Sequence, residues 1–261
     1  MLGRAAVLRY LRRSIYPAPA ARPVELPAGA EIVRTDGTEP AFAVHAAAAG
    51  DACTVVYFHG NGEQLSDTGS LRASIVDAGL GFVAVEYPGY GLAAAQDPSE
   101  ANLYRAAAAM LDHLHGTRGL HAERTVLLGH SLGTAVAVEM ATRGYACRLV
   151  LSAPFTSTAD MVRHLTPYLP AGLIAAGERL DSLAKAPRVE VPTLLIHGAQ
   201  DEVVPVWMSA TLTDNLRHAH RVVLPGRGHN DVEDAISRAA VIAATEPPER
   251  WAILLTGPRT A

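Results

Sequence analysis

The 261-residue sequence predicts an α/β fold with a mostly parallel central sheet, helices on both faces and a short helical cap. Short β-type runs alternate with longer helical stretches, which is the pattern of βαβ units. The inner runs, such as CTVVYF and TVLL, are almost continuously apolar, as strands buried on both faces are. One connection is much longer than a crossover requires, which indicates an inserted cap.

Eight strands are expected. The first two flank Asp36-Gly37, a hairpin-type turn, and no helix separates them. The sheet should therefore begin antiparallel and continue parallel. The predicted strands are residues 31–34, 41–46, 53–58, 82–87, 125–128, 148–152, 193–196 and 221–224.

Three helices between these strands have recognisable ends. They are predicted at residues 99–115, 132–143 and 231–245. Ser99 begins the first one and Gly116 ends it, Gly144 ends the second, and Pro247 follows the third. Helices in these connections would cover both faces of the sheet through right-handed crossovers.

The chain divides into four parts. A basic amphipathic segment (1–26) precedes a domain at 27–246, which contains a cap insertion at 155–187, and a tail follows at 247–261. The cap is predicted because about 40 residues separate two strands there and Pro167, Pro170 and Gly172 break its helical pieces. Its apolar side chains either bind an acyl chain or pack the cap on the body; they are Leu165, Tyr168, Leu169, Leu173 and Ile174.

The N-terminal segment forms an apolar and a basic face when drawn as a helix. Val7, Leu8, Leu11 and Ile15 share one face, Arg9, Arg12 and Arg13 lie opposite, and Arg4 interrupts the apolar set. Such a helix makes weak contact with a membrane surface or docks on the protein body. Both interpretations stay open.

Composition excludes several classes of protein. Hydrophobic residues make up 49% and charged residues 18%, which excludes a disordered chain. The net charge of −4 argues against nucleic-acid binding. No apolar stretch is long enough to cross a bilayer, and the N-terminus does not resemble a signal peptide. Cys53 and Cys147 are expected to be buried thiols, so a cytoplasmic location is predicted, with peripheral membrane contact if the N-terminal helix lies on lipid.

Gly129-His130-Ser131-Leu132-Gly133 fits G-x-S-x-G, the nucleophile elbow. A predicted strand precedes it and a predicted helix follows it, as this strained turn requires. The alternative is that Ser131 only caps a helix. The context favours Ser131 as a nucleophile.

A serine nucleophile needs a base, and the base needs a carboxylate to orient it. His229 lies in a glycine-flanked loop after the last predicted strand, where open α/β sheets place their sites. Asp201 follows the preceding strand and is the expected acid. Glu202 and Asp181 are the alternatives, although Asp181 suits a helix cap better. The other histidines fit surface or turn positions.

The oxyanion formed during acyl transfer needs two donors. The backbone N–H of Leu132, directly after the nucleophile, is one. The glycine-rich turn His59-Gly60-Asn61-Gly62 follows an earlier strand, and Asn61 is the expected second donor. A plain tight turn is the alternative interpretation of this segment. No cofactor is expected, because no other motif has the right context, and no metal is expected, because His113/His115 and His218/His220 lack a third ligand.

Together, FHGNG, EYPGYG with PSE, GHSLG, IHGAQDEVVP and GRGHND resemble the α/β-hydrolase superfamily over residues 41–244. The chain is most similar to small-lid serine hydrolases related to depalmitoylating thioesterases and bacterial esterases. The resemblance implies the α/β-hydrolase fold, with Ser131 as nucleophile, Asp201 as acid, His229 as base, and Asn61 and Leu132 at the oxyanion hole. Relatives often have Asp-Tyr-Arg-Gly-Tyr-Gly where this chain has Glu86-Tyr87-Pro88-Gly89-Tyr90-Gly91, so the pocket here differs.

Three function classes follow. The first is a serine hydrolase that acts on a small-molecule or lipid-like carboxylic ester or thioester. The second is an acyltransferase or serine peptidase with the same triad. The third is a binding module without catalysis, because fold alone does not determine function.

Overall fold

The computed structural model describes residues 12, 15–166, 168 and 177–256. These residues form an eight-stranded sheet in the order β1-β2-β4-β3-β5-β6-β7-β8. β2 pairs antiparallel with β1 and with β4, and the other neighbours are parallel, as predicted. The strands are β1 (Ala30–Arg34), β2 (Phe42–Ala46), β3 (Thr54–Phe58), β4 (Gly81–Val85), β5 (Thr125–His130), β6 (Arg148–Ser152), β7 (Thr193–Gly198) and β8 (Ala219–Leu224).

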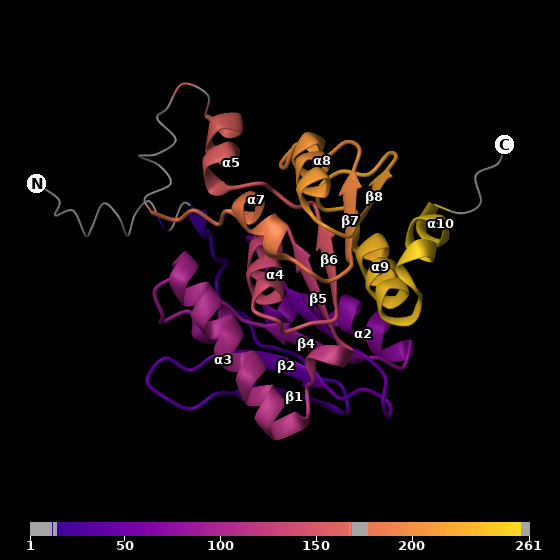
Figure 1. Cartoon of the computed structure of the whole chain (residues 1–261). Coiled ribbons are helices and arrows are strands. Elements are labelled where there is room, and N and C mark those ends of the chain that lie inside the picture. Colours follow the sequence, from indigo (N-terminus) through magenta and orange to yellow (C-terminus); the bar gives the residue numbers. More distant parts are fainter. Residues whose placement is uncertain (1–11, 13–14, 167, 169–176, 257–261) are drawn as a thin grey trace, which may run out of the picture.

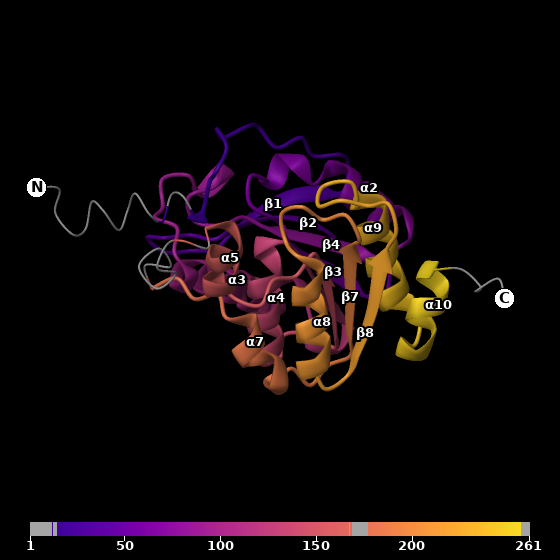
Figure 2. The same cartoon turned by 90° about the horizontal axis from the view of Figure 1, so that it is seen from above.

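Helices cover both faces of this sheet (Figures 1 and 2). One face carries α3 (Glu100–Arg118), α4 (Leu132–Thr142), α7 (Ser182–Lys185) and α8 (Val206–Asn215). The other carries α2 (Gly69–Asp77), α9 (Glu233–Thr245) and α10 (Trp251–Thr256). The inner strands are apolar throughout because each contributes side chains to both of the resulting cores.

The predicted strands are all present, with ends that shift by one or two residues. The predicted helix 99–115 continues through Gly116 and ends only at Gly119, which has a left-handed φ of 65° and closes the helix. Gly116 has open space around it and is tolerated inside the helix. Helices α2 and α10 have no counterpart among the predicted helices.

The cap begins with α5 (Thr158–Leu165) and ends with α7. Leu169, Leu173 and Ile174 of the predicted apolar set lie outside the described residues, as do Val7, Leu8 and Leu11 of the N-terminal helix. Ile15 packs against one of the two cores, and Tyr16 is buried beside it. The end of the N-terminal segment therefore lies on the body of the domain.

Part of the predicted tail also packs on the domain. Trp251 is fully buried and its Nε1 donates a hydrogen bond to the carbonyl of Glu246, 3.0 Å away. Cys53 and Cys147 are free but only half-buried, so their predicted burial is wrong. Each lies one residue before a strand, β3 or β6, and keeps part of its surface exposed. Within the described ranges, no helix has the length and apolarity needed to cross a bilayer.

Candidate active site

Ser131 lies at the sharp turn between β5 and α4, with φ 48° and ψ −116°. A non-glycine residue in this region of φ is strained, and such strain is typical of a nucleophile elbow. The two flanking glycines make the turn possible. A Cβ on Gly133 would overlap the carbonyl oxygen of Phe58 in β3, and one on Gly129 would overlap the backbone of α4. The G-x-S-x-G spacing therefore has a steric cause.

The structure brings Ser131, His229 and Asp201 together. Ser131 Oγ lies 3.1 Å from His229 Nε2, and His229 Nδ1 lies 2.7 Å from Asp201 Oδ2. The three residues come from loops after β5, β8 and β7, which are parallel and therefore end at the same edge of the sheet. This is the relative arrangement of a nucleophile, a base and an orienting carboxylate.

Asp201 is held as a carboxylate by its surroundings. Its Oδ1 accepts hydrogen bonds from the backbone N–H of Val203 (2.9 Å) and of Val204 (2.8 Å), and its side chain is fully buried. Burial acts to raise the pKa of Asp201, but hydrogen bonds from His197, His229 and Val204 together hold it well below its usual range.

A second histidine, His197, contacts the same carboxylate. Its Nε2 lies 3.3 Å from Asp201 Oδ2 and 2.9 Å from the carbonyl oxygen of Val204. The sequence suggested only a turn residue here. The signal that could have revealed this contact is its position at the end of β7, four residues before Asp201.

The alternative acids lie elsewhere. Asp181 caps α7, and its Oδ1 accepts a hydrogen bond from the N–H of Ala184 at 2.9 Å, as expected of a helix cap. Glu202 is exposed. Neither carboxylate contacts His229.

Gly60 and Asn61 lie beside the nucleophile. A Cβ built on Gly60 would lie 3.5 Å from Ser131 Cβ, an ordinary contact distance, and only 3.1 Å from Glu63 Oε1 and from His130 Cδ2, so a larger residue would crowd these two side chains. The side chain of Asn61 is already bonded, because its Oδ1 accepts from the Tyr90 hydroxyl at 2.8 Å and its Nδ2 donates to the Ile15 carbonyl at 2.9 Å. Its backbone N–H donates no hydrogen bond among the described residues. Leu132 is the first residue of α4, so its backbone N–H has no hydrogen-bond partner within that helix.

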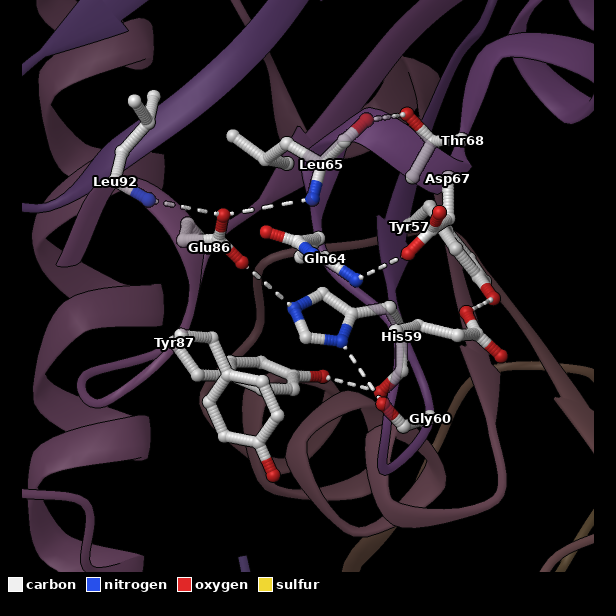
Figure 3. Close-up of polar contacts among 12 residues, drawn as sticks. Tyr57, His59, Gly60, Gln64, Leu65, Asp67, Thr68, Glu86, Tyr87 and Leu92 are labelled. Carbon is white, nitrogen blue, oxygen red and sulfur yellow. Dashed lines mark hydrogen bonds and ion pairs between the residues drawn. The ribbon is translucent and has the colours of Figure 1, made fainter. Parts of the chain in front are cut away.

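A buried polar cluster lies beneath this loop (Figure 3). His59 Nε2 lies 3.1 Å from Glu86 Oε1, and neither side chain is exposed to solvent. The other ring nitrogen, Nδ1, lies 2.9 Å from the carbonyl oxygen of Gly60. The sequence assigned no such pair. Its signal is positional, since each residue directly follows one of two neighbouring parallel strands, β3 and β4.

His130 directly precedes Ser131 and lies next to Gly60, whose built Cβ would be 3.1 Å from its Cδ2. Its Nδ1 is 3.2 Å from Ser152 Oγ, and its ring centroid is 5.2 Å from that of His229. Burial lowers the pKa of His130, although Glu63 acts in the opposite direction. His130 thus lines the cavity next to Ser131, but it is His229 that contacts the Ser131 hydroxyl.

A cavity of about 490 Å³ opens at Ser131 and His229. Its walls are mainly apolar and include Ile15, Phe155, Met161 and Leu180. Such a volume suits a small ligand with an apolar part. Among the described residues, no group of three or more His, Cys, Asp or Glu side chains could hold a metal ion.

Two family models match parts of this chain, and proteins of several organisms are similar to it. A family model described as serine aminopeptidase, S33, matches residues 51–176, and one described as TAP-like protein matches residues 175–245. An uncharacterized protein of Mycobacterium tuberculosis is 34% identical over 85% of this chain and 81% of its own length. The alpha/beta hydrolase domain-containing protein aho-3 of Caenorhabditis elegans is 31% identical over 79% of this chain and 61% of its own length.

Solved structures share the fold. An alpha-beta hydrolase from Vibrio vulnificus superimposes with a TM-score of 0.72 at 20% identity, covering 90% of this chain and 91% of that one. The monoacylglycerol lipase of Paleococcus ferrophilus gives a TM-score of 0.57 at 19% identity over 81% of this chain and 97% of that one. A thioesterase domain from the curacin biosynthetic pathway gives 0.57 at 16% identity over 81% and 98%.

Proposed function

Because the chain belongs to the α/β-hydrolase superfamily, we propose that it is a serine hydrolase that cleaves carboxylic ester or thioester bonds through an acyl-enzyme on Ser131. One observation carries the proposal. A continuous chain of contacts runs from Ser131 Oγ through both nitrogens of His229 to Asp201, at the mouth of an apolar cavity.

The first half-reaction acylates Ser131. His229 Nε2 removes the hydroxyl proton as Ser131 Oγ attacks the carbonyl carbon, and Asp201 keeps the Nδ1 proton of His229 in place. The negative charge that develops on the carbonyl oxygen is stabilised by the N–H groups of Leu132 and Asn61. Protonated His229 then gives its proton to the departing alcohol or thiol.

The second half-reaction releases the acid. A water molecule takes the position of the leaving group, His229 removes one of its protons, and the resulting attack re-forms the oxyanion. Collapse of this intermediate returns the proton to Ser131 Oγ. The free enzyme and a carboxylic acid are the products.

The cavity supports an acyl substrate with an apolar chain. Phe155, Met161 and Leu180 belong to the cap region and face the same space as Ser131. Burial of each methylene against such a wall contributes about 0.8 kcal/mol. A lipid-like ester is the substrate class we propose, and the names of the lipase and thioesterase relatives agree with it.

A fluorophosphonate probe tests the nucleophile. We expect one adduct, on Ser131, and no adduct on Ser131→Ala. Ester turnover should fall by about 10⁵–10⁶ in this variant, with an unchanged thermal melt. Turnover that survives the substitution would remove Ser131 as the nucleophile, and an unlabelled wild-type protein would favour a binding module. Ester and acyl-CoA thioester series of increasing chain length then define the acyl group.

A serine peptidase is the second candidate, favoured by the family model described as a serine aminopeptidase. The same contacts between Ser131 and His229 serve an amide substrate, with the amine as leaving group. Parallel assays with aminoacyl p-nitroanilides and p-nitrophenyl esters separate the two candidates. Transfer to added alcohols, measured as new ester, identifies an acyltransferase.

A further inference from the structure

We propose that His59 and Glu86 are positioning residues, which hold the peptide between Gly60 and Asn61 so that its N–H points at the oxyanion. This inference rests on the proposed function, because it concerns the same loop. Neither side chain reaches the cavity, since both are fully buried. They act through the backbone of the loop that does.

The two partners of His59 determine its protonation. Nδ1 faces the carbonyl oxygen of Gly60 at 2.9 Å, and Nε2 faces Glu86 Oε1 at 3.1 Å. A carbonyl oxygen and a carboxylate only accept hydrogen bonds, so both contacts are satisfied when both nitrogens carry a proton. Burial acts to lower the pKa of His59, but the hydrogen bond and charge of Glu86, with help from Glu63 and the Gly60 carbonyl, raise it above its usual value. Because a carbonyl oxygen only accepts, Nδ1 of His59 carries a proton and donates it to Gly60.

The hydrogen bond from His59 to the Gly60 carbonyl orients the peptide between Gly60 and Asn61, and with it the Asn61 N–H. In a trans peptide the C=O of one residue and the N–H of the next are antiparallel. Because the Gly60 oxygen is turned toward the buried ring of His59, the Asn61 N–H points the other way, to the side of the loop that faces Ser131. Among the described residues this N–H donates no hydrogen bond, so it is free to meet the substrate oxygen.

Glu86 holds His59 and also joins two further segments. Its Oε2 lies 3.4 Å from the backbone N–H of Leu65, at the end of the loop, and 3.4 Å from that of Leu92 (Figure 3). Tyr87 stacks on His59 with ring centroids 4.1 Å apart and donates to the His59 carbonyl at 3.0 Å. These contacts leave the imidazole a single orientation.

Three variants test the positioning role. His59→Phe keeps roughly the volume of the ring and removes its hydrogen bond to the Gly60 oxygen, which then keeps only the longer one from the N–H of Glu63 at 3.4 Å. We expect kcat/KM for a p-nitrophenyl ester to fall by about 10², the effect of losing one oxyanion donor, with the loss in kcat and little change in KM. Glu86→Ala should do the same, whereas Glu86→Gln should retain most of the activity, because its amide can donate to Nε2 of a neutral imidazole.

A trifluoromethyl ketone supplies the readout that a merely structural role would not change. Its adduct with Ser131 carries the oxyanion, so His59→Phe should weaken its binding by the same factor as kcat/KM. Glu139→Ala is the matched control: this carboxylate binds Lys185 at 2.7 Å, far along α4 from the nucleophile, and its loss should leave kcat and inhibitor affinity unchanged.

The outcomes separate this inference from the proposed function. Wild-type protein that neither reacts with a fluorophosphonate nor turns over esters overturns both. Active wild type with equally active His59→Phe and Glu86→Ala overturns the positioning role alone. If His59→Phe does not fold, the comparison of Glu86→Ala with Glu86→Gln decides: equal kcat and equal ketone affinity in these two contradict the inference.

Discussion

Replacing Asp201 with Asn tests whether this carboxylate orients His229. The substitution keeps the shape of the side chain but replaces one oxygen with an NH₂ group. In the wild-type protein, Oδ1 accepts from the N–H groups of Val203 and Val204, and Oδ2 accepts from His229 Nδ1. An amide can satisfy only one of these two sides with its oxygen.

The backbone decides which side receives the oxygen. Turning the NH₂ group toward Val203 and Val204 would set it against two backbone donors, and at the buried residue Val204 the unsatisfied N–H costs about 1–3 kcal/mol. The amide oxygen of Asn at position 201 therefore keeps the hydrogen bonds from the backbone N–H groups, and its NH₂ group donates to His229 Nδ1. His229 then carries its proton on Nε2, the nitrogen 3.1 Å from Ser131 Oγ, and cannot accept the hydroxyl proton.

The productive orientation is thus disfavoured by about 1–3 kcal/mol, which corresponds to roughly 5- to 160-fold. Loss of the negative charge beside the imidazolium reduces the rate further. We expect kcat/KM at pH 8 to fall by about 10³–10⁴, measured with a p-nitrophenyl ester. Glu202→Gln, which changes the exposed neighbouring carboxylate, is the control and should retain wild-type turnover.

Asp201 also makes stability depend on pH. The pKa of Asp201 is lowered in the folded protein, so its contribution to the free energy of unfolding is present above about pH 4, the unfolded pKa, and is lost as pH falls through the lower folded value. Urea titrations should show a steeper loss of stability in acid for wild type than for Asp201→Asn.

A fall in kcat/KM of less than tenfold for Asp201→Asn would refute the assigned orientation of His229.

Three further predictions concern the framework around the site. Gly133→Ala places a methyl group against the Phe58 carbonyl and should cost about 3 kcal/mol or more in urea unfolding, whereas Gly116→Ala, with open space around it, should stabilise α3 by up to about 1 kcal/mol; equal effects would contradict the steric argument. The raised pKa of His59 means that its contribution to stability is complete below about pH 6.5 and is lost as pH rises through the higher folded value, so the free energy of unfolding should decline as the pH rises above about 6.5 in wild type and decline less in Glu86→Gln. Met161→Trp should shorten the cavity and reduce kcat/KM for dodecanoyl esters by about 60- to 200-fold, the value of three to four methylenes at about 0.8 kcal/mol each, with acetyl esters unaffected; equal losses for both esters would place the acyl chain elsewhere.

The strands, the change from antiparallel to parallel pairing and the meeting of Ser131, Asp201 and His229 could be predicted from the sequence because each leaves a local pattern. Apolar runs mark the buried strands, and G-x-S-x-G records a steric need of the turn between β5 and α4. Asp201 and His229 follow strands, and parallel strands end at one edge. The chemistry at that edge is therefore encoded within a few residues of each strand end.

The parts that could not be predicted depend on packing between distant segments. Helix α10 follows two prolines, so its sequence suggests a tail. In the structure its Trp251 is buried and the helix packs against α9 and β8. The end of α3 depends on which of two glycines adopts a positive φ, and the nearer one, Gly116, remains helical. Burial of Cys53 and Cys147 was overestimated because their apolar neighbours belong to strands that begin one residue later.

His59 and Glu86 show why positioning residues are harder to recognise than catalytic ones. A catalytic side chain must reach the reacting atoms, so its position within a loop is constrained and produces a motif. A positioning side chain need only reach a neighbouring loop, and which loop is the neighbour depends on the strand order. Here β4 lies beside β3, while β5 takes the other side of β3. That order joins His59 to Glu86 across 27 positions in the sequence. The unusual glutamate of EYPGYG therefore has a structural reason, since a side chain there must span from the end of β4 to the imidazole and also meet the N–H groups of Leu65 and Leu92.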